Sequence, residues 1–194
     1  MRDYYLIGDV MPPAVVKTIE EEIFWQYAKL ISKSAGLGNQ RAFQMNRFMA
    51  LRDGKIKWST AIREYIKEHE NHGVCIYCNT EKSNLSTEHI LPKSCGGPDI
   101  ADNAIRVCMN CNDKKNGRRL YEWYGLKNND KIPRIAEGKY LKLLYSMHEK
   151  NGTLKTDRNM LLTTLCAKCN LKSKCEQDST EGALSVYCLE GSFS

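Results

Sequence analysis

The first third of the chain carries apolar residues at the spacing of amphipathic helices. From residue 14 to residue 34 they recur every three or four positions, between prolines and a glycine that suit helix ends. The same spacing predicts further helices over 38–52 and 57–70. The residues expected to face inward are Phe43, Phe48, Leu51, Trp58, Ile62, Tyr65 and Ile66. We therefore expect a helical region over residues 1–70 whose aromatic side chains belong to its core.

The pattern changes between residues 71 and 117, where Gly, Cys, Asn and Pro become frequent. Apolar runs such as "GVCIYC" and "AIRVC" are short enough for strands and tight turns. Helical spacing returns in "KYLKLLYSMHEK", residues 139–150, and a short helix is expected in "DRNMLLTTLC", residues 157–166. The chain is therefore predicted to be α+β, mainly helical, with a small stranded module at its centre.

Composition sets the class of protein. The chain is 42% hydrophobic, as folded globular proteins are, and it has no apolar run long enough to cross a membrane. Its first residues lack the long apolar stretch of a signal peptide. These features predict a cytoplasmic protein with no membrane partner and with reduced thiols.

The nine cysteines then become candidate metal ligands, since disulfides are rare in a reducing compartment. Two CxxC pairs, "CIYC" and "CMNC", contain Cys75, Cys78, Cys108 and Cys111. Four thiolates in two such turns can surround one ion tetrahedrally, which predicts a structural zinc site. The 29 residues between the pairs exceed what a simple zinc ribbon needs, so this insertion is where further chemistry is expected.

The insertion contains "EHILPKS", then "GGPD" and "DN", and "CNDKK" overlaps the end of the second cysteine pair. This order of motifs inside a four-cysteine frame resembles the HNH endonuclease family over about residues 73–117. The resemblance implies a ββα-metal fold that hydrolyses phosphodiester bonds. Such a reaction needs an activated water and a divalent cation on the phosphate.

The resemblance also implies a role for each motif residue. His89 would be the general base, and Asn103 would hold the His89 ring by its side chain or backbone and so fix its tautomer. Glu88 and Asn112 would hold the catalytic cation, with Asn116 as the alternative to Asn112. Glu88 stands where Asp is commoner and Asn112 where His is commoner, and this pair of oxygen ligands favours Mg²⁺ or Mn²⁺. Because neighbouring strand residues face opposite sides, Glu88 and His89 can share a site only where the strand bends.

Charge points toward a polyanionic partner. The net charge is +6, and residues 113–158 hold twelve Lys and Arg against six Asp and Glu, a local excess of +6. A solvated helical surface would give the same count. The residues expected to contact phosphates are Lys93, Arg106, Lys114 and Lys115. DNA is the expected partner, and RNA stays open as an alternative.

A second group of cysteines follows near the end of the sequence. Cys166, Cys169 and Cys175 lie in "CAKCNLKSKC", and Cys188 comes after twelve further residues. Four cysteines again predict one metal site, either a second structural zinc or a 4Fe–4S cluster. Their irregular spacing is closer to cluster-binding loops than to a zinc ribbon. Cys95 has no assigned partner and is expected to be a free thiol.

The sequence therefore predicts four regions: helices over 1–70, an HNH module over 71–120, a helical extension over 121–160 and a metal-binding tail over 161–194. The predicted function is a metal-dependent DNA endonuclease with a role in restriction, anti-phage defence or a mobile element. Two alternatives stay open. One is a non-catalytic zinc-dependent nucleic-acid-binding protein, and the other is a nuclease subunit that needs a larger defence or restriction complex.

Overall fold

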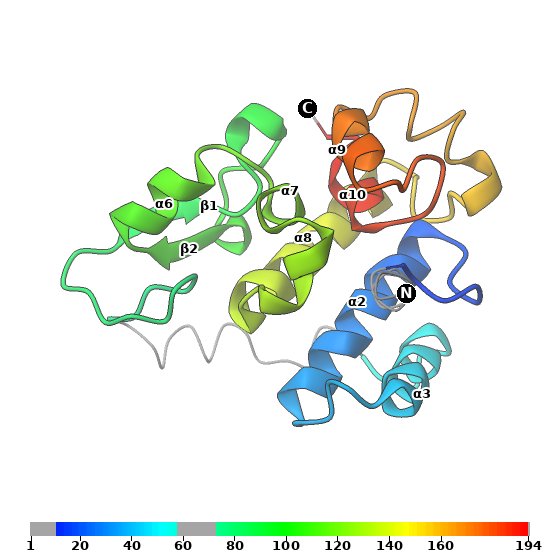
Figure 1. The fold of residues 1–194 in the computed structure, drawn as a ribbon, viewed down its shortest axis with the longest axis horizontal. Helices are drawn as coiled ribbons and strands as arrows, with labels where there is room; N and C mark the ends of the chain where they lie inside the picture. Colours follow the sequence, from blue (N-terminus) through cyan, green and yellow to red (C-terminus); the bar gives the residue numbers. More distant parts are fainter. Residues whose placement is uncertain (1–10, 58–72, 194) are drawn as a thin grey trace, which may run out of the picture.

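The computed structural model describes residues 11–57 and 73–193, and it combines helices with one small sheet (Figure 1). The helices are α2 (Ile19–Ser34), α3 (Arg41–Arg52), α6 (Met109–Lys115), α7 (Leu120–Tyr124), α8 (Arg134–Lys150), α9 (Lys172–Gln177) and α10 (Val186–Glu190). The strands are β1 (Ser86–His89) and β2 (Ala104–Val107), and short 3-10 turns lie at η1 (Lys93–Cys95), η2 (Ala101–Asn103), η3 (Leu126–Lys131) and η4 (Arg158–Met160). The predicted α+β class is confirmed.

The first predicted helix begins five residues later than expected, at Ile19. Thr18 is extended, and its hydroxyl accepts a hydrogen bond from the backbone N–H of Glu21 at 3.2 Å. A side-chain cap of this kind satisfies a free N–H and fixes the helix start. The second helix, α3, buries Phe48 and Leu51 as predicted. The helix predicted over 57–70 lies outside the described residues.

The segment predicted as a helix over 157–166 forms only the 3-10 turn η4 followed by turns, so this prediction is wrong. Asp157 lies at the start of η4 and caps it. Its carboxylate accepts hydrogen bonds from the backbone N–H groups of Asn159 and Met160, which closes a single tight turn. The helix predicted over 139–150 is present, and it begins earlier, at Arg134, as α8.

The stranded module has the ββα order. β1 and β2 are antiparallel with Ser86 opposite Val107 and His89 opposite Ala104, and α6 follows β2 directly. Figure 1 shows this module on one side of the molecule, with α7 leading from it to the long helix α8. Because these elements are short, the module buries little apolar surface of its own, and we expect its stability to depend on the neighbouring helices and on the four cysteines.

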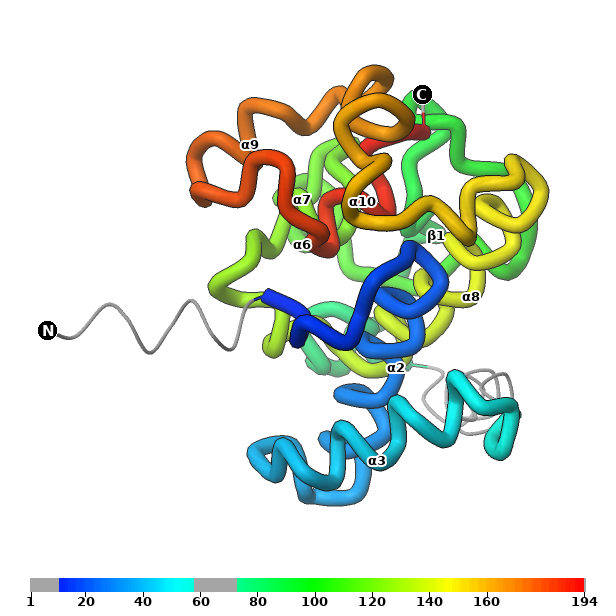
Figure 2. The backbone as a smooth tube through the Cα atoms, turned by 90° about the vertical axis from the view of Figure 1, so that its right-hand side faces the viewer, coloured from blue at the N-terminus to red at the C-terminus, as the bar shows by residue number. Residues whose placement is uncertain are grey.

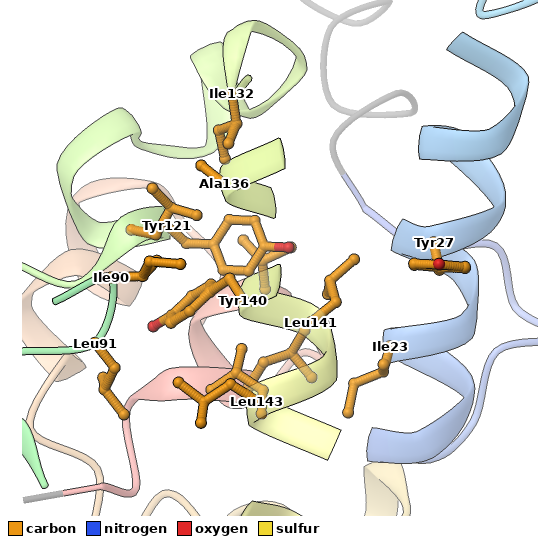
Figure 3. Packing of buried hydrophobic residues seen from close by; sticks show 14 of the residues in the cluster. Ile23, Tyr27, Ile90, Leu91, Tyr121, Ile132, Ala136, Tyr140, Leu141 and Leu143 are labelled. Carbon is orange, nitrogen blue, oxygen red and sulfur yellow. The ribbon is translucent and has the colours of Figure 1, made fainter. Parts of the chain in front are cut away.

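The buried apolar residues form one continuous cluster that reaches all four predicted regions. It includes Ile23 of α2, Leu91 after β1, Tyr140 of α8 and Leu189 of α10. Figure 3 shows Tyr121 and Tyr140 packed together near Leu91, with their ring centroids 5.6 Å apart. The module is thus anchored to the helical part by side chains from α7 and α8.

The C-terminal segment returns to the middle of the molecule. α10 contacts both α2 and α7, and its position beside α7 is visible in Figures 1 and 2. The ring of the buried His148 in α8 lies 2.9 Å from the carbonyl oxygen of Leu189. Within residues 11–57 and 73–193, no helix is long and apolar enough to span a membrane.

Candidate active site

The first cysteine group forms a compact site. The Sγ atoms of Cys75, Cys78, Cys108 and Cys111 all lie within 4.8 Å of one another. The Sγ atoms of Cys78 and Cys108 are 3.9 Å apart, close to the ~3.8 Å edge of a tetrahedron whose zinc–sulfur bonds are about 2.3 Å. A hydrogen bond with Thr80 lowers the pKa of Cys78 to about 6, while burial raises the pKa of Cys111. The predicted four ligands are therefore brought together, and they could hold a metal such as zinc.

The first cysteine turn also supports the sheet. Tyr77 lies between Cys75 and Cys78, and its hydroxyl donates a hydrogen bond of 2.8 Å to a carboxylate oxygen of Glu88. Its ring packs edge-on against Trp123 of α7 at 4.9 Å. One residue thus connects the cysteine frame, β1 and α7.

Glu88 faces the interior of the module. Its side chain is 8% exposed, and its second carboxylate oxygen is 2.5 Å from the Nζ of Lys115 in α6. The same ammonium donates to the carbonyl oxygen of His89 at 3.1 Å. The Lys115 side chain is fully buried, so the predicted contact between Lys115 and phosphate is wrong. This lysine instead joins α6 to β1, and burial lowers its pKa while the Glu88 charge raises it.

His89 faces the other side of β1, toward solvent. Successive strand residues alternate, so Ser86 and Glu88 lie on the α6 side while Thr87 and His89 do not. The His89 Nε2 is 2.9 Å from a carboxylate oxygen of Asp99, and Lys93 donates to the other oxygen at 2.7 Å. These two hydrogen bonds hold the pKa of Asp99 below its ordinary value, and the bond from Lys93 has the larger effect. The His89 side chain is 25% exposed, so a substrate can reach it.

Asp99 was not among the predicted site residues. It lies in the "GGPD" segment, ten residues after His89, and nothing in the spacing indicates that its carboxylate returns to the imidazole. A carboxylate hydrogen-bonded to one ring nitrogen fixes the tautomer, leaving the other nitrogen to accept a proton. Asp99 therefore makes the contact with the His89 ring that the sequence assigned to Asn103.

Asn103 holds a loop instead of the His89 ring. Its fully buried side chain accepts a hydrogen bond from the backbone N–H of Leu91 and donates to the carbonyl oxygens of Leu91 and Pro98, all at 2.8–2.9 Å. Its own carbonyl accepts from Ile90 at 2.8 Å. The expected contact with the ring is therefore corrected: Asn103 closes the loop that carries Lys93 and Asp99.

The same loop requires the second glycine of the "GG" pair. A Cβ atom placed on Gly97 would lie 1.9 Å from the backbone oxygen of Leu91, far inside any permitted contact. Gly97 also donates its N–H to Pro92 at 3.0 Å. The loop is thus closed by backbone contact, which only a residue without a side chain allows.

Asn112 lies in the first turn of α6, directly after Cys111. Its amide nitrogen is 3.5 Å from the hydroxyl of Ser86, at the outer limit of a hydrogen bond. Ser86 and Glu88 share one face of β1, and Asn112 and Lys115 share the face of α6 that meets it. The two predicted ligands therefore lie on the same side of β1, but Lys115 and Tyr77 hold the Glu88 oxygens. Asn116, the alternative ligand, is exposed at the end of α6.

The other predicted nucleic-acid contacts are at the surface. Lys93 is 55% exposed beside Asp99, Arg106 on β2 is exposed, and Lys114 in α6 is exposed. Lys93 lies on the His89 side of the module, because both side chains contact the same carboxylate. A phosphate near His89 would therefore meet the Lys93 charge as well.

The second cysteine group is arranged differently. Cys166, Cys169, Cys175 and Cys188 line one cavity at the C-terminal end. In the described part of the chain, only the first group brings three or more metal-binding side chains within 4.8 Å of one another. Cys95 is half-buried in η1 and belongs to neither group.

Comparisons with known proteins identify the class of the stranded module. Residues 75–120 match the family model described as HNH endonuclease, which confirms the predicted resemblance for this segment. A curated relative, the type IV methyl-directed restriction enzyme EcoKMcrA of Escherichia coli (strain K12), is 29% identical over 104 residues. The alignment covers 49% of this chain and 38% of the relative, so the chain matches under half of that protein's length. No solved structure matches the chain.

Proposed function

We propose that the chain is a metal-dependent endonuclease that hydrolyses phosphodiester bonds in DNA. The observation that carries this proposal is the His89–Asp99 pair at 2.9 Å, on the open face of an HNH endonuclease domain. A water beside the free nitrogen of the imidazole would lose its proton to His89 as it attacks phosphorus. Lys93, bonded to the same carboxylate, would place a positive charge near the phosphate.

The catalytic cation is assigned to Glu88 and Asn112. Both residues lie where β1 meets α6, and their oxygens suit Mg²⁺ or Mn²⁺. Bound there, the cation would neutralise phosphate charge and assist the leaving oxygen. Because Glu88 and His89 face opposite sides of β1, the cation and the imidazole act on one phosphate only if the strand bends at this pair. Glu88 can bind it only if the Lys115 ammonium moves off the carboxylate, because both cations would need the same oxygen. The Cys75, Cys78, Cys108 and Cys111 site is assigned a structural zinc, which would fix the first turn of α6 and hence Asn112.

The relative suggests the biological setting. It is named as a methyl-directed restriction enzyme, and we propose a restriction or defence role for this chain on that basis. The alignment covers only 38% of that relative, so the recognition of modified bases by this chain is a separate proposal. Plasmids of one sequence, with and without cytosine methylation, would reveal such selectivity as a difference in cleavage rate.

The ion pair between Lys115 and Glu88 favours one alternative function. If Lys115 stays on the carboxylate, the module keeps its fold and surface charge but lacks the acidic metal ligand, as in a non-catalytic nucleic-acid-binding protein. Plasmid cleavage measured across Mg²⁺ and Mn²⁺ concentrations, with EDTA and Zn²⁺ lanes, separates the two. We expect Mg²⁺ or Mn²⁺ to support cleavage, and Asn112→Ala to require a higher metal concentration than wild type.

The matched control is Asp113→Ala, which removes an exposed acidic side chain next to Asn112 and should leave the metal dependence unchanged. DNA binding without cleavage in any metal would support the binding protein. Equal metal dependence of Asn112→Ala and wild type would contradict the assignment of this residue as a ligand.

A further inference from the structure

The second cysteine group shares one cavity of about 250 Å³. Its walls come from the turns after η4, from α9 and from α10, so the four thiols converge although they are spread over 23 positions of the chain, 166 to 188. The cavity is also lined by apolar side chains, among them Leu162, Leu165 and Tyr187. Leu165 and Cys188 are buried while Leu162 is exposed, so the cavity is partly shielded from solvent.

The backbone is fitted closely around one of the sulfurs. Leu171 donates its N–H to the Sγ of Cys169 at 3.4 Å. A Cβ on Gly191 would lie only 2.4 Å from the same sulfur, and Asn170 donates to the Gly191 carbonyl at 3.0 Å. An N–H group directed at a sulfur stabilises a thiolate, and bound clusters commonly receive such hydrogen bonds.

The second group is more open than the first. One zinc with four thiolates requires sulfur–sulfur edges of about 3.8 Å, as the 3.9 Å between Cys78 and Cys108 illustrates. In the described residues, the second group is not gathered in that way, and its sulfurs border a space several times the ~30 Å³ that one water occupies. A cubane cluster binds one thiolate to each of its four irons, so it holds the sulfurs farther apart and fills the space between them.

We propose that Cys166, Cys169, Cys175 and Cys188 bind a 4Fe–4S cluster. The charged residues that line the same cavity are Lys172, Glu176 and Glu181, so the proposal is carried by the four thiols and not by the surrounding charges. The cluster would organise a segment whose own elements, α9 and α10, are only six and five residues long.

The cluster would also support the nuclease module. Two residues after Cys188, the buried carboxylate of Glu190 accepts hydrogen bonds from the backbone N–H groups of Tyr121 at 3.1 Å and Glu122 at 2.6 Å. These groups lie at the start of α7, which packs on Tyr77 through Trp123. Loss of the cluster should therefore loosen α10 first and then the contact between α7 and the module.

The test is metal analysis of the full chain purified without oxygen, with iron, acid-labile sulfide, zinc and visible absorption measured together. We expect about four iron and four sulfide per chain, plus about one zinc at the first site. Cys175→Ala should lose the iron and the visible absorption and keep the single zinc. Cys95→Ala, a change at a cysteine of neither group, should retain both metals.

About two zinc per chain and no iron, even after anaerobic incubation with ferrous and ferric iron and sulfide, would overturn the proposal. If Cys175→Ala does not fold, the metal content of wild type still decides between the two outcomes. None of these readouts depends on DNA cleavage, so the cluster and the nuclease proposal can fail separately.

Discussion

The Lys115–Glu88 pair offers a sharp test of how the module is held together. Replacing Lys115 with Met keeps most of the length of the side chain and removes its charge. The structure then leaves the buried Glu88 carboxylate with Tyr77 as its hydrogen-bond partner, and the carbonyl of His89 loses a donor. Removing one partner of a buried ion pair typically costs 3–5 kcal/mol, so we expect Lys115→Met to lower the free energy of unfolding by about 3 kcal/mol or more.

The assay is urea unfolding of zinc-loaded protein at fixed zinc, followed by the loss of helical circular dichroism. Glu88→Gln should destabilise the protein as well, because it leaves the ammonium buried and unpaired. The double variant should cost less than the sum of the two single changes by about 2 kcal/mol or more, since it leaves no uncompensated charge. Lys114→Met, the exposed neighbour, is the control and should stay within ~0.5 kcal/mol of wild type. A cost below about 1 kcal/mol for Lys115→Met, or additive single changes, would refute the reasoning.

Three further predictions concern the loop, the histidine partner and a buried acid. Gly97→Ala should destabilise the module and reduce cleavage, because its Cβ would clash with a backbone oxygen, whereas Gly73→Ala meets open space and should do neither; thermal melts of the two variants compare them. Asp99→Asn should lower the cleavage rate about 10- to 100-fold with unchanged circular dichroism, since it disturbs the His89 tautomer from an exposed position; an unchanged rate would exclude Asp99 from the mechanism. Burial raises the pKa of Glu137 to about 7, so the folded state binds a proton between pH 4.5 and 7 and its stability falls as pH rises through that window. Glu137→Gln should remove up to about 1 kcal/mol per pH unit of that decline in urea titrations, and parallel profiles for both proteins would contradict the pKa.

The sequence predicted the parts of the site that depend on local order. Two CxxC turns converge because each turn is short and the strands between them pair, so Cys75 and Cys111 could be assigned from spacing alone. The ββα order followed from short apolar runs and from the resemblance to HNH endonucleases. The helix starts were less accurate because caps such as Thr18 depend on single hydroxyl groups.

The contacts across the module could not be read from spacing. Lys115 resembles any surface lysine of a basic stretch, and only the packing of α6 on β1 buries its ammonium against Glu88. Asp99 reaches His89 because Asn103 and Gly97 close the loop between them. These are long-range consequences of tertiary structure, and local propensity carries no information about them.

The most direct test of the central claim is plasmid cleavage by wild type, His89→Ala and Thr87→Ala in Mg²⁺ or Mn²⁺. Thr87 is the control because it is exposed on the same face of β1 as His89. We expect nicking or linearisation by wild type and Thr87→Ala, and loss of cleavage in a folded, zinc-containing His89→Ala. Equal cleavage by His89→Ala and wild type would show that the imidazole is not the base and would contradict the account of the site.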